Sequence, residues 1–221
     1  HLDLHTGIGG FSLAARWSGY QTIAHSEIEP YCNELLTARF PTVPNLGDVR
    51  TLCKRTHDCI APPYLEHDEA LELWEAGEEV DLWCPVHDES FGDCPCLGTD
   101  QFLEDHGQPD VITSGFPCQD VSNNGSREGL DGSKSSLYAE TPRIARELES
   151  PFVLFENVAS LKTRGFDRIA EELEAIGYAV GAVVVNARTI KAAHKRERVF
   201  GVAHLTGERV ERLRAEGIEE S

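Results

Sequence analysis

Apolar and polar positions follow one another in a regular order at the start of the chain. A short apolar segment, residues 1–4, precedes a glycine-rich turn at 6–10, and apolar residues then recur at helical spacing over 11–17. A second strand-like segment, 20–25, is followed by a helical segment, 31–40, that stops at Pro41. Strands that alternate with helices in this way are typical of a parallel sheet with crossover helices, so the pattern predicts an α/β fold.

The same pattern is interrupted between residues 50 and 108 and resumes afterwards. The interrupting segment holds five of the seven cysteines, two of the three tryptophans and a Pro-Pro pair, which indicates an insertion. Further strands are predicted at 110–114, 151–155, 178–187 and 198–204, and further helices at 137–149 and 166–176. We therefore expect residues 1–49 and 109–205 to form the two halves of one core, and residues 206–221 to form a charged, helical tail.

Length and composition fit one globular core with a small appended module. Of the 221 residues, 40% are hydrophobic and 26% are charged. No apolar run approaches the roughly 18 residues that suggest a membrane span, and no secretory signal is visible, so we expect a cytoplasmic protein. The chain opens with His1 rather than methionine and enters a strand at once, which indicates an internal fragment of a longer product.

Charge is unevenly distributed along the chain. The formal net charge is −18, with a strongly acidic segment at 66–81 and a basic cluster of Lys191, Lys195, Arg196 and Arg198. An enzyme that acts on nucleic acid normally presents positive charge to the phosphates. The acidity therefore argues against tight binding of nucleic acid by this chain alone, and it equally fits a solubilising acidic surface.

The glycine loop and two later acidic residues outline a nucleoside site. Gly7 and Gly9 lie where a strand passes into a helix, at the strand end where open α/β sheets bind ligands. Glu27 ends the second strand, where a carboxylate can accept both ribose hydroxyls, and Asp48 can accept from an adenine amino group. No Gly-Lys-Ser/Thr phosphate cradle is present, so S-adenosylmethionine fits better than NAD. A tight structural turn and solvated loop acids are the alternatives.

Three kinds of side chain later in the chain indicate nucleophilic catalysis. Cys118 follows a predicted strand in a loop flanked by glycine and proline, which favours a reactive thiol over a small buried hydrophobe. Glu156 stands at the end of another predicted strand. An unpaired carboxylate beside a buried strand is energetically costly, which favours a functional role. Arg196 and Arg198 are two residues apart and lead into a strand, so we expect both to project to the same side.

These residues occur in motifs that resemble the DNA cytosine-5 methyltransferase family, in the family's order and over nearly the whole chain outside the insertion. The motifs are Asp3-Leu4-His5-Thr6-Gly7-Ile8-Gly9-Gly10-Phe11, Ser26-Glu27, Gly47-Asp48-Val49, Gly115-Phe116-Pro117-Cys118-Gln119 with Ser122, Ser136-Leu137-Tyr138, Phe155-Glu156-Asn157-Val158 and His194-Lys195-Arg196-Glu197-Arg198. Three residues depart from the family pattern. His5 stands where an aromatic residue commonly stacks on adenine, Ile28 where a larger apolar residue is frequent, and His194 in place of glutamine.

The resemblance implies a Rossmann-like, S-adenosylmethionine-dependent methyltransferase core and a role for each motif. The cofactor-binding residues that it implies are Asp3, Thr6, Gly7, Ile8, Gly9, Glu27, Ile28, Asp48, Val49, Pro117 and Leu137. The catalytic residues that it implies are Cys118, Glu156, Arg196 and Arg198. It also implies double-stranded DNA as the partner, and the nucleoid of a prokaryotic or phage-infected cell as the location.

The chemistry of cytosine explains why these residue types occur together. C5 is too weak a nucleophile to take a methyl group directly, whereas attack of the Cys118 thiolate on C6 turns C5 into an enamine-like carbon. In the family's mechanism Glu156, hydrogen-bonded at N3, stabilises the charge that develops on the ring, and Arg198 holds the O2 side. Arg196 stabilises the thiolate or orients the loop. The base must leave the duplex to reach the thiol, so base flipping is implied.

The insertion contains cysteine and histidine pairs that indicate a metal site. The ligands that we predict are Cys84, His87, Cys94 and Cys96. Their C-x2-H and C-x-C spacings place four ligands around one tetrahedral ion such as Zn²⁺. A short polar insertion with little hydrophobic core also needs stabilisation of the kind that a bound metal ion provides. A second cluster at 53–59 supplies alternatives, and free thiols are the competing interpretation. An odd number of cysteines without a secretory signal disfavours a disulfide framework.

About 20 residues follow the arginine motif, too few for the target-recognition region and the last cofactor-contacting motif that the family normally carries. The chain is therefore expected to be a fragment, a split enzyme that awaits a second subunit, or a degenerate copy. Two other functions stay open: a tRNA cytosine-5 methyltransferase of the same catalytic type, and a catalytically silent binding subunit. A thiol–disulfide enzyme is disfavoured, since Cys94 and Cys96 lack the usual C-x-x-C spacing.

Overall fold

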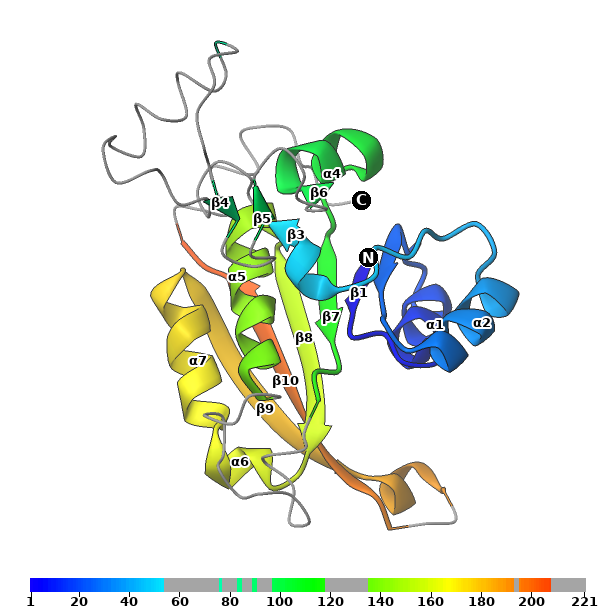
Figure 1. Ribbon diagram of the computed structural model, residues 1–221. Helices are drawn as coiled ribbons and strands as arrows, with labels where there is room; N and C mark the ends of the chain where they lie inside the picture. Colours follow the sequence, from blue (N-terminus) through cyan, green and yellow to red (C-terminus); the bar gives the residue numbers. More distant parts are fainter. Residues whose placement is uncertain are drawn as a thin grey trace. The chain divides into compact units, whose positions relative to one another are not determined.

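The computed structural model describes residues 1–53, 76, 83–84, 89–90, 97–117, 135–192 and 195–207. The chain divides into two compact units, of which one contains residues 1–49 and 108–221 and the other residues 50–107. The larger unit is built around a six-stranded sheet with helices packed on it (Figure 1). The predicted α/β fold is therefore confirmed.

Six strands form the sheet of the larger unit, in the order β2-β1-β7-β8-β10-β9. Their bounds are β1 Leu2–Leu4, β2 Ala24–Ser26, β7 Val111–Ser114, β8 Phe152–Val158, β9 Tyr178–Asn186 and β10 Glu197–Leu205. Strands β2, β1, β7 and β8 run parallel, as the sequence pattern predicts, whereas β10 runs antiparallel to β8 and β9. The expectation of a parallel sheet is wrong for β10, because the connection from β9, residues 187–196, is shorter than the roughly dozen residues of a crossover.

One face of the sheet is covered by two helices, α5 (Glu140–Leu148) and α7 (Phe166–Ala175) (Figure 1). Side chains from the helices and the strands meet in a core that is at most 1% exposed: Ile144, Leu148, Val153, Phe155, Ile169, Leu173, Val199 and Ala203. A Cβ atom at Gly201 would overlap the Phe155 ring, so β10 requires glycine at that position. Each enclosed valine, leucine, isoleucine or phenylalanine side chain stabilises the fold by roughly 1.5–3 kcal/mol.

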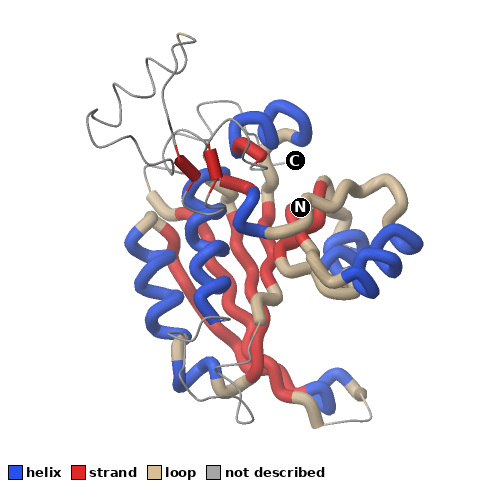
Figure 2. The backbone as a smooth tube through the Cα atoms, viewed as in Figure 1, coloured by secondary structure: helices blue, strands red, loops and turns tan. Residues whose placement is uncertain are grey.

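The N-terminal helices follow the first two strands, and Figure 2 shows strand and helix alternating there. Helix α1 spans Gly10–Trp17 and helix α2 spans Pro30–Arg39, within one residue of the predicted segments. Helix α2 begins with proline, which is tolerated in the first turn because its missing N–H has no partner there. A short helix, α6 (Leu161–Arg164), precedes α7.

The described residues of the smaller unit include four short strands and helix α4 (Thr99–His106). Strand β3 (Leu52–Cys53) pairs parallel with β6 (Leu97–Gly98), and β4 (Trp83–Cys84) pairs antiparallel with β5 (Glu89–Ser90). Helix α4 buries Phe102 completely. The predicted ligands Cys84, His87, Cys94 and Cys96 have side chains outside the described residues, so zinc stays a prediction. Within the described ranges, no group of three or more His, Cys, Asp or Glu residues could hold a metal ion, and no helix is long and apolar enough to cross a membrane.

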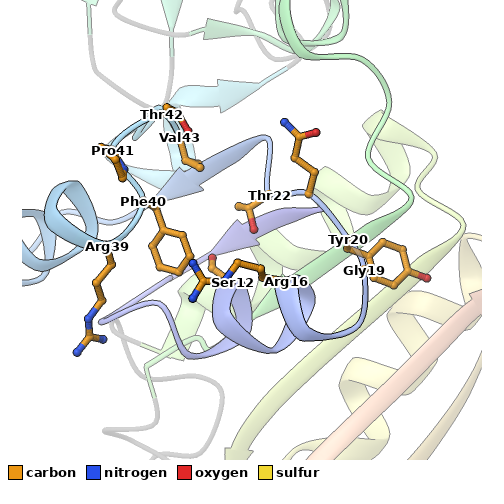
Figure 3. Close-up of a pocket in the computed structure, with 11 residues that line it drawn as sticks. Ser12, Arg16, Gly19, Tyr20, Thr22, Arg39, Phe40, Pro41, Thr42 and Val43 are labelled. Carbon is orange, nitrogen blue, oxygen red and sulfur yellow. The ribbon is translucent and has the colours of Figure 1, made fainter.

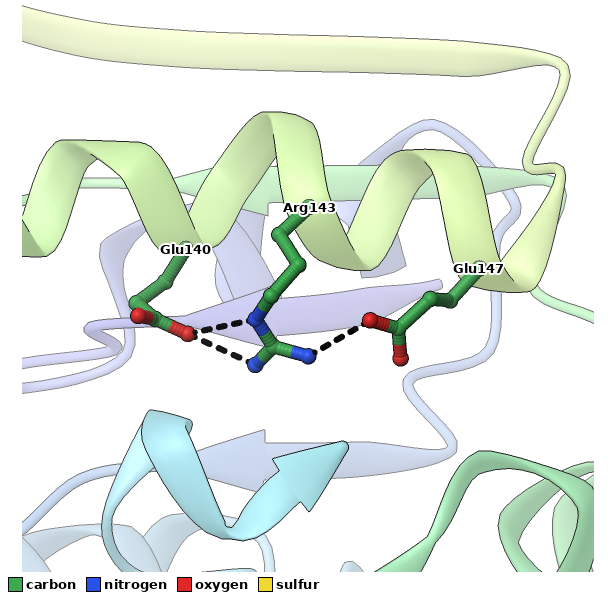
Figure 4. A network of polar contacts seen from close by, with 3 residues as sticks. All are labelled: Glu140, Arg143 and Glu147. Carbon is green, nitrogen blue, oxygen red and sulfur yellow. Dashed lines mark hydrogen bonds and ion pairs between the residues drawn. The ribbon is translucent and has the colours of Figure 1, made fainter. Parts of the chain in front are cut away.

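Helix α5 carries a network of three charged side chains along one of its faces (Figure 4). The Arg143 guanidinium lies 2.6 Å from the Glu140 carboxylate and 2.8 Å from the Glu147 carboxylate. All three side chains are largely enclosed. Spacings of three and four residues place such side chains on one helix face, and partial burial makes the loss of one partner more costly than on an open surface.

Replacing Arg143 by methionine is expected to lower the free energy of unfolding by about 2 kcal/mol, because two enclosed carboxylates lose this partner. Urea denaturation of the variant and the parent chain measures the difference. Arg146→Met is the matched control, because Arg146 lies exposed on the same helix, and its replacement should change the free energy by less than about 0.5 kcal/mol. Equal losses in both variants would show that the network contributes nothing specific.

Candidate active site

Most of the predicted cofactor and catalytic residues gather where the parallel strands end. β2, β1, β7 and β8 point the same way, so their carboxyl ends lie along one edge of the sheet. The glycine loop follows β1, Glu27 follows β2, residues 115–117 follow β7, and Glu156 lies near the end of β8. Open α/β sheets bind ligands at this edge, so the fold places most of the predicted residues where such chemistry occurs.

The glycine loop between β1 and α1 is held by hydrogen bonds of Thr6. The Thr6 hydroxyl donates to the Asp3 carbonyl at 2.7 Å, and the Thr6 N–H donates to the Ser26 carbonyl at 3.1 Å. Gly9 has a φ of 85°, and a Cβ atom there would lie 2.8 Å from the Phe40 ring. Glycine alone meets both requirements, and the resulting tight loop leaves the N-terminus of α1 at the edge of the sheet.

The Glu27 carboxylate connects this loop to the beginning of α2. One carboxylate oxygen accepts from the Gly7 N–H at 2.6 Å, and the other accepts from the N–H groups of Ile28 at 2.9 Å and Glu29 at 2.8 Å. An ionised carboxylate offers about four lone-pair positions. Three are used within the protein, which leaves acceptor capacity for a hydroxyl of a bound ligand. The Ile28 side chain is exposed beside it.

Asn45 fastens the segment that carries Asp48 to the end of β2. Its side-chain oxygen accepts from the N–H groups of Glu27 at 3.0 Å and Gly47 at 3.2 Å, and its side-chain nitrogen donates to the Glu27 carbonyl at 2.9 Å. Asp48 is half-buried and Val49 is buried. Sequence reasoning missed Asn45, although an asparagine two residues before a glycine is a turn signal.

His5 is the residue around which the predicted cofactor residues meet. Its φ is 53°, a left-handed conformation that is rare outside glycine. Burial lowers the pKa of His5 to about 4, against the opposing influence of Glu27, of a hydrogen bond with the Leu137 backbone, and of Asp48. Its Nε2 atom is buried without a hydrogen-bond partner in the described part of the chain. A strained, neutral, flat ring with a spare polar atom fits an adenine-like ligand, a role that the sequence indicated only as a departure from the family pattern.

Asp3 lies behind the loop in a buried polar network. Its carboxylate is fully enclosed and accepts from the Ser12 N–H at 3.0 Å, the Ser12 hydroxyl at 2.6 Å and the Thr113 hydroxyl at 2.8 Å. The Ser12 hydroxyl also contacts His25 Nε2 at 2.9 Å. Burial raises the pKa of Asp3 to about 7 and lowers the pKa of His25 to about 4. The Asp3 carboxylate therefore positions α1, and any direct contact with a cofactor stays a prediction.

The shifted pKa values of His5, His25 and Asp3 predict how the stability of the fold depends on pH. His5 and His25 bind protons in the unfolded chain at pH values between 6.5 and 4 but not in the folded one, so acidification destabilises the fold. Between pH 7 and 3.8, Asp3 is protonated in the folded chain but not in the unfolded one, so its protonation stabilises the fold as the pH falls. The balance is about one proton, so the free energy of unfolding should fall by about 1.4 kcal/mol per pH unit over this interval.

Urea denaturation at a series of pH values measures this slope. His25→Gln should flatten it, because His5 and Asp3 then nearly cancel. Asp3→Asn should steepen it, because the opposing group is gone. A slope that neither substitution changes would contradict the assignment of the pH dependence to this network.

Glu156 and Arg198 form an ion pair across neighbouring strands. The Arg198 Nε atom lies 2.6 Å from the Glu156 Oε1 atom, and both side chains are about three-quarters buried. The antiparallel register places Arg198 opposite Val158 and Glu156 opposite Phe200, so the two charges lie on the same face of the sheet. Arg196 lies exposed just before β10. The structure thus brings two of the predicted catalytic side chains into contact.

The segment that leads into Cys118 is held by hydrogen bonds to β1 and β8. The Gly115 N–H donates to the Leu4 carbonyl at 3.2 Å, and the Phe116 carbonyl accepts from the Asn157 side chain at 3.1 Å. Phe116 is buried and Pro117 is half-buried. Cys118 itself lies outside the described residues.

A cavity of about 500 Å³ lies between α1 and the segment at the end of α2, residues 39–43 (Figure 3). Arg16, Phe40 and Arg39 line it, and the Arg16 guanidinium lies 5.6 Å from the centre of the Phe40 ring. Arg39 also donates to the Ile8 carbonyl at 2.9 Å, which fastens the glycine loop from outside. Among the described residues, no predicted catalytic or cofactor-binding residue lines this cavity, so it is separate from the site at the strand ends.

Comparison with known proteins gives the class of this chain. The model of the family described as C-5 cytosine-specific DNA methylase matches residues 85–220, more than half of the chain. The match includes the nucleophile loop, the strand of Glu156 and the arginine motif. The chain therefore belongs to the C-5 cytosine-specific DNA methylase family.

Individual relatives agree with this class. The type II methyltransferase M.AplI of Arthrospira platensis is 30% identical over 208 residues, which are 93% of this chain and 45% of the relative. M.HhaI of Haemophilus parahaemolyticus is 23% identical over 203 residues, which are 90% of this chain and 47% of the relative. The chain thus spans about half the length of the curated relatives it matches.

Solved structures show the same fold at low sequence identity. A protein described as a DNA modification methyltransferase from an E. coli prophage superposes with a TM-score of 0.60 at 19% identity, over 100% of this chain and 48% of that one. The S. pombe Dnmt2 methyltransferase superposes with a TM-score of 0.53 at 18% identity, over 100% of this chain and 56% of that one. Identities this low support the fold alone.

Proposed function

We propose that this chain carries the catalytic half of a DNA cytosine-5 methyltransferase that uses S-adenosylmethionine. The observation that carries the proposal is the ion pair of Glu156 and Arg198, which lies at the same edge of the sheet as the glycine loop and beside the fastened segment before Cys118. Membership of the methylase family supports the reaction class. Double-stranded DNA is the proposed substrate.

The residues at the strand ends fit a nucleoside cofactor that lacks phosphates. Glu27 has acceptor capacity left for a ribose hydroxyl, and the half-buried Asp48 is proposed to accept from an adenine amino group. The His5 ring, with a partnerless Nε2 atom in the described part of the chain, can stack on adenine. When bound, S-adenosylmethionine supplies an electrophilic methyl group. The further residues proposed to contact it are Asp3, Thr6, Gly7, Ile8, Gly9, Ile28, Val49, Pro117 and Leu137.

The proposed reaction proceeds through a covalent bond between the chain and the base. The Cys118 thiolate adds to C6 of the flipped cytosine, and the electron pair moves toward C5 and the N3 side of the ring. Glu156 holds and protonates N3, and Arg198 holds both Glu156 and the O2 side. After C5 has gained the methyl group, a base removes the C5 proton, the thiolate leaves, and N3 returns its proton to Glu156. Arg196, exposed near the start of β10, is proposed to orient the nucleophile loop.

The partner half of the enzyme is part of the proposal. The relatives M.AplI and M.HhaI contain about as much sequence again as they share with this chain. A net charge of −18 repels DNA at long range. We therefore propose that target recognition and most contacts with DNA phosphates come from sequence outside residues 1–221.

Covalent trapping tests the proposal. The chain is incubated with S-adenosylmethionine and duplex DNA that contains 5-fluorocytosine, where fluorine replaces the C5 proton and prevents release of the enzyme. A covalent adduct on a denaturing gel and by intact mass is the expected result. Cys118→Ser should abolish it, and Cys32→Ser, which alters a partly exposed free thiol, should not. Competition with unmodified tRNA separates the DNA enzyme from a tRNA enzyme.

Three results would count against the proposal. An adduct that survives Cys118→Ser would show that another group is the nucleophile. No adduct, despite measurable cofactor binding, would contradict catalysis by this chain alone and favour a silent subunit. Loss of both adduct and cofactor binding would reject the methyltransferase activity altogether.

A further inference from the structure

The cavity between α1 and residues 39–43 differs in charge from the rest of the chain. Arg16 and Arg39 line it together with hydroxyl and amide side chains, and no aspartate or glutamate is among the described residues that line it (Figure 3). Acidic residues outnumber lysine and arginine in the chain by 38 to 20. The Asp3 carboxylate behind Ser12 is fully enclosed, so it presents no surface to the cavity. This arginine cavity, as we call it, therefore offers positive charge to an anionic ligand.

The two arginines of this cavity have hydrogen-bond donors to spare. Among the described residues, neither Arg16 nor Arg39 forms an ion pair with a carboxylate. Arg39 donates from Nη1 to the Ile8 carbonyl at 2.9 Å, and the Arg16 guanidinium lies over the Phe40 ring, 5.6 Å from its centre. Because a guanidinium has several N–H donors in one plane, both side chains can donate further hydrogen bonds. Phosphate and carboxylate groups match this arrangement of donors.

The Phe40 ring holds this part of the cavity wall in place. Figure 3 shows Arg39 on one side of the ring and Arg16 on the other. The ring is buried and packs edge-on against His25, with the ring centres 5.3 Å apart. A guanidinium over an aromatic face is attracted to it, so the fixed ring also limits where the Arg16 guanidinium can lie. Two cationic groups are thereby presented to one cavity.

We propose that the arginine cavity is a second ligand site, which binds a small organic phosphate. Arg16 and Arg39 hold the phosphate group. The side chains of Tyr20, Gln21 and Thr42, which also line the cavity, hydrogen-bond to hydroxyl groups of the organic part. The volume of about 500 Å³ lies within the range of small-molecule sites, roughly 300–1,000 Å³, and exceeds what a bare phosphate ion fills. The ligand is therefore about as large as a sugar phosphate.

Arg39 connects the arginine cavity to the glycine loop. It holds the Ile8 carbonyl of the loop, and Phe40 packs so closely against the loop that a Cβ atom at Gly9 would lie 2.8 Å from its ring. Arg39 is exposed, and holding an exposed side chain in one geometry costs conformational entropy. A phosphate that fixes its guanidinium removes this cost, so it should tighten cofactor binding, and the cofactor should tighten phosphate binding by the same factor. This coupling rests on the proposed function, whereas the phosphate site itself does not.

Isothermal titration of the whole chain in phosphate-free buffer of low ionic strength tests the site. Ribose 5-phosphate should bind at one site with a Kd below about 1 mM, inorganic phosphate should compete for that site more weakly, and ribose should not bind. Arg16→Gln should weaken ribose 5-phosphate binding at least tenfold. Arg146→Gln is the matched control, because it removes the same charge from an exposed position on α5, and it should leave binding unchanged. Equal weakening in both variants, or inorganic phosphate that binds as tightly as ribose 5-phosphate, would overturn the proposal.

A second titration tests the coupling and separates it from the proposed function. Saturating ribose 5-phosphate should tighten S-adenosylmethionine binding about fivefold, and Arg39→Gln should remove this difference. Cofactor binding without ribose 5-phosphate binding would overturn the phosphate site and leave the proposed function standing. Ribose 5-phosphate binding that leaves cofactor affinity unchanged would overturn the coupling, whereas a loss of cofactor binding alone would count against the proposed function. Urea denaturation shows that the variants are folded.

Discussion

Replacing Glu156 by glutamine should slow adduct formation on 5-fluorocytosine DNA by about a thousandfold. Glutamine keeps the length of the side chain and can still accept from the Arg198 Nε atom, which lies 2.6 Å from the carboxylate. It cannot pass a proton to N3 of the base, so the charge that develops when Cys118 attacks C6 is no longer neutralised. Single-turnover rates from quenched gels measure the effect.

The control for this prediction is Glu174→Gln, because Glu174 lies exposed on α7, away from the strand ends. Its rate of adduct formation should equal that of the parent chain. Cofactor affinity should be the same in both variants, since Glu156 is not among the residues around His5. A Glu156→Gln rate within threefold of the parent rate would remove Glu156 from the proposed catalytic machinery and leave its ion pair as a structural contact.

Replacing Gly9 by alanine should lower S-adenosylmethionine affinity at least tenfold and the free energy of unfolding by about 2–3 kcal/mol. The added Cβ would lie 2.8 Å from the Phe40 ring and 3.1 Å from Leu36, and alanine is strained at a φ of 85°. The glycine loop must therefore move, and with it the Gly7 N–H that donates a hydrogen bond to the Glu27 carboxylate. Isothermal titration and urea denaturation measure the two effects.

Gly10→Ala is the matched control for Gly9→Ala. A Cβ at Gly10 meets no atom within 4 Å, and Gly10 is the first residue of α1. Alanine there should leave cofactor affinity unchanged and raise the free energy of unfolding by up to about 1 kcal/mol, since alanine favours helix. If Gly9→Ala bound the cofactor as tightly as the parent chain, the loop would not be the cofactor site.

Sequence patterns predicted best the helices, strands and turns whose formation depends on interactions between residues close together in the chain. The glycine turn, α1, α2, α7 and β9 lie within one residue of their predicted places, because apolar spacing and turn residues act over a few positions. β8 was predicted to end at Phe155, but it continues to Val158. Pairing with β10 extends the strand through Glu156 and Asn157, and a sequence pattern cannot show a pairing partner.

Long-range contacts account for what sequence reasoning missed at the site. The reversal of β10 depends on the length of one connection and on where its partners lie. The hydrogen bonds of Asn45 join residues 18 positions apart as well as neighbours, and the His5 ring interacts with Glu27, Asp48 and Leu137, which lie far from it in the sequence. Motif order made Glu156 and Arg198 candidates, whereas their ion pair could be seen only in the folded chain.

The reversal of β10 also determines where this chain can change in length. Arg198 reaches Glu156 because β10 begins beside the place where β8 ends, and successive strand residues face opposite sides of the sheet. Insertion of a single residue within β8 or β10 would turn one member of this pair toward α5 and α7. Residues 50–107 form a compact unit of their own, so additions there leave the strand register untouched. Libraries of insertions or grafted segments should therefore yield folded chains when they are placed in that unit, and inactive ones when they are placed in these two strands.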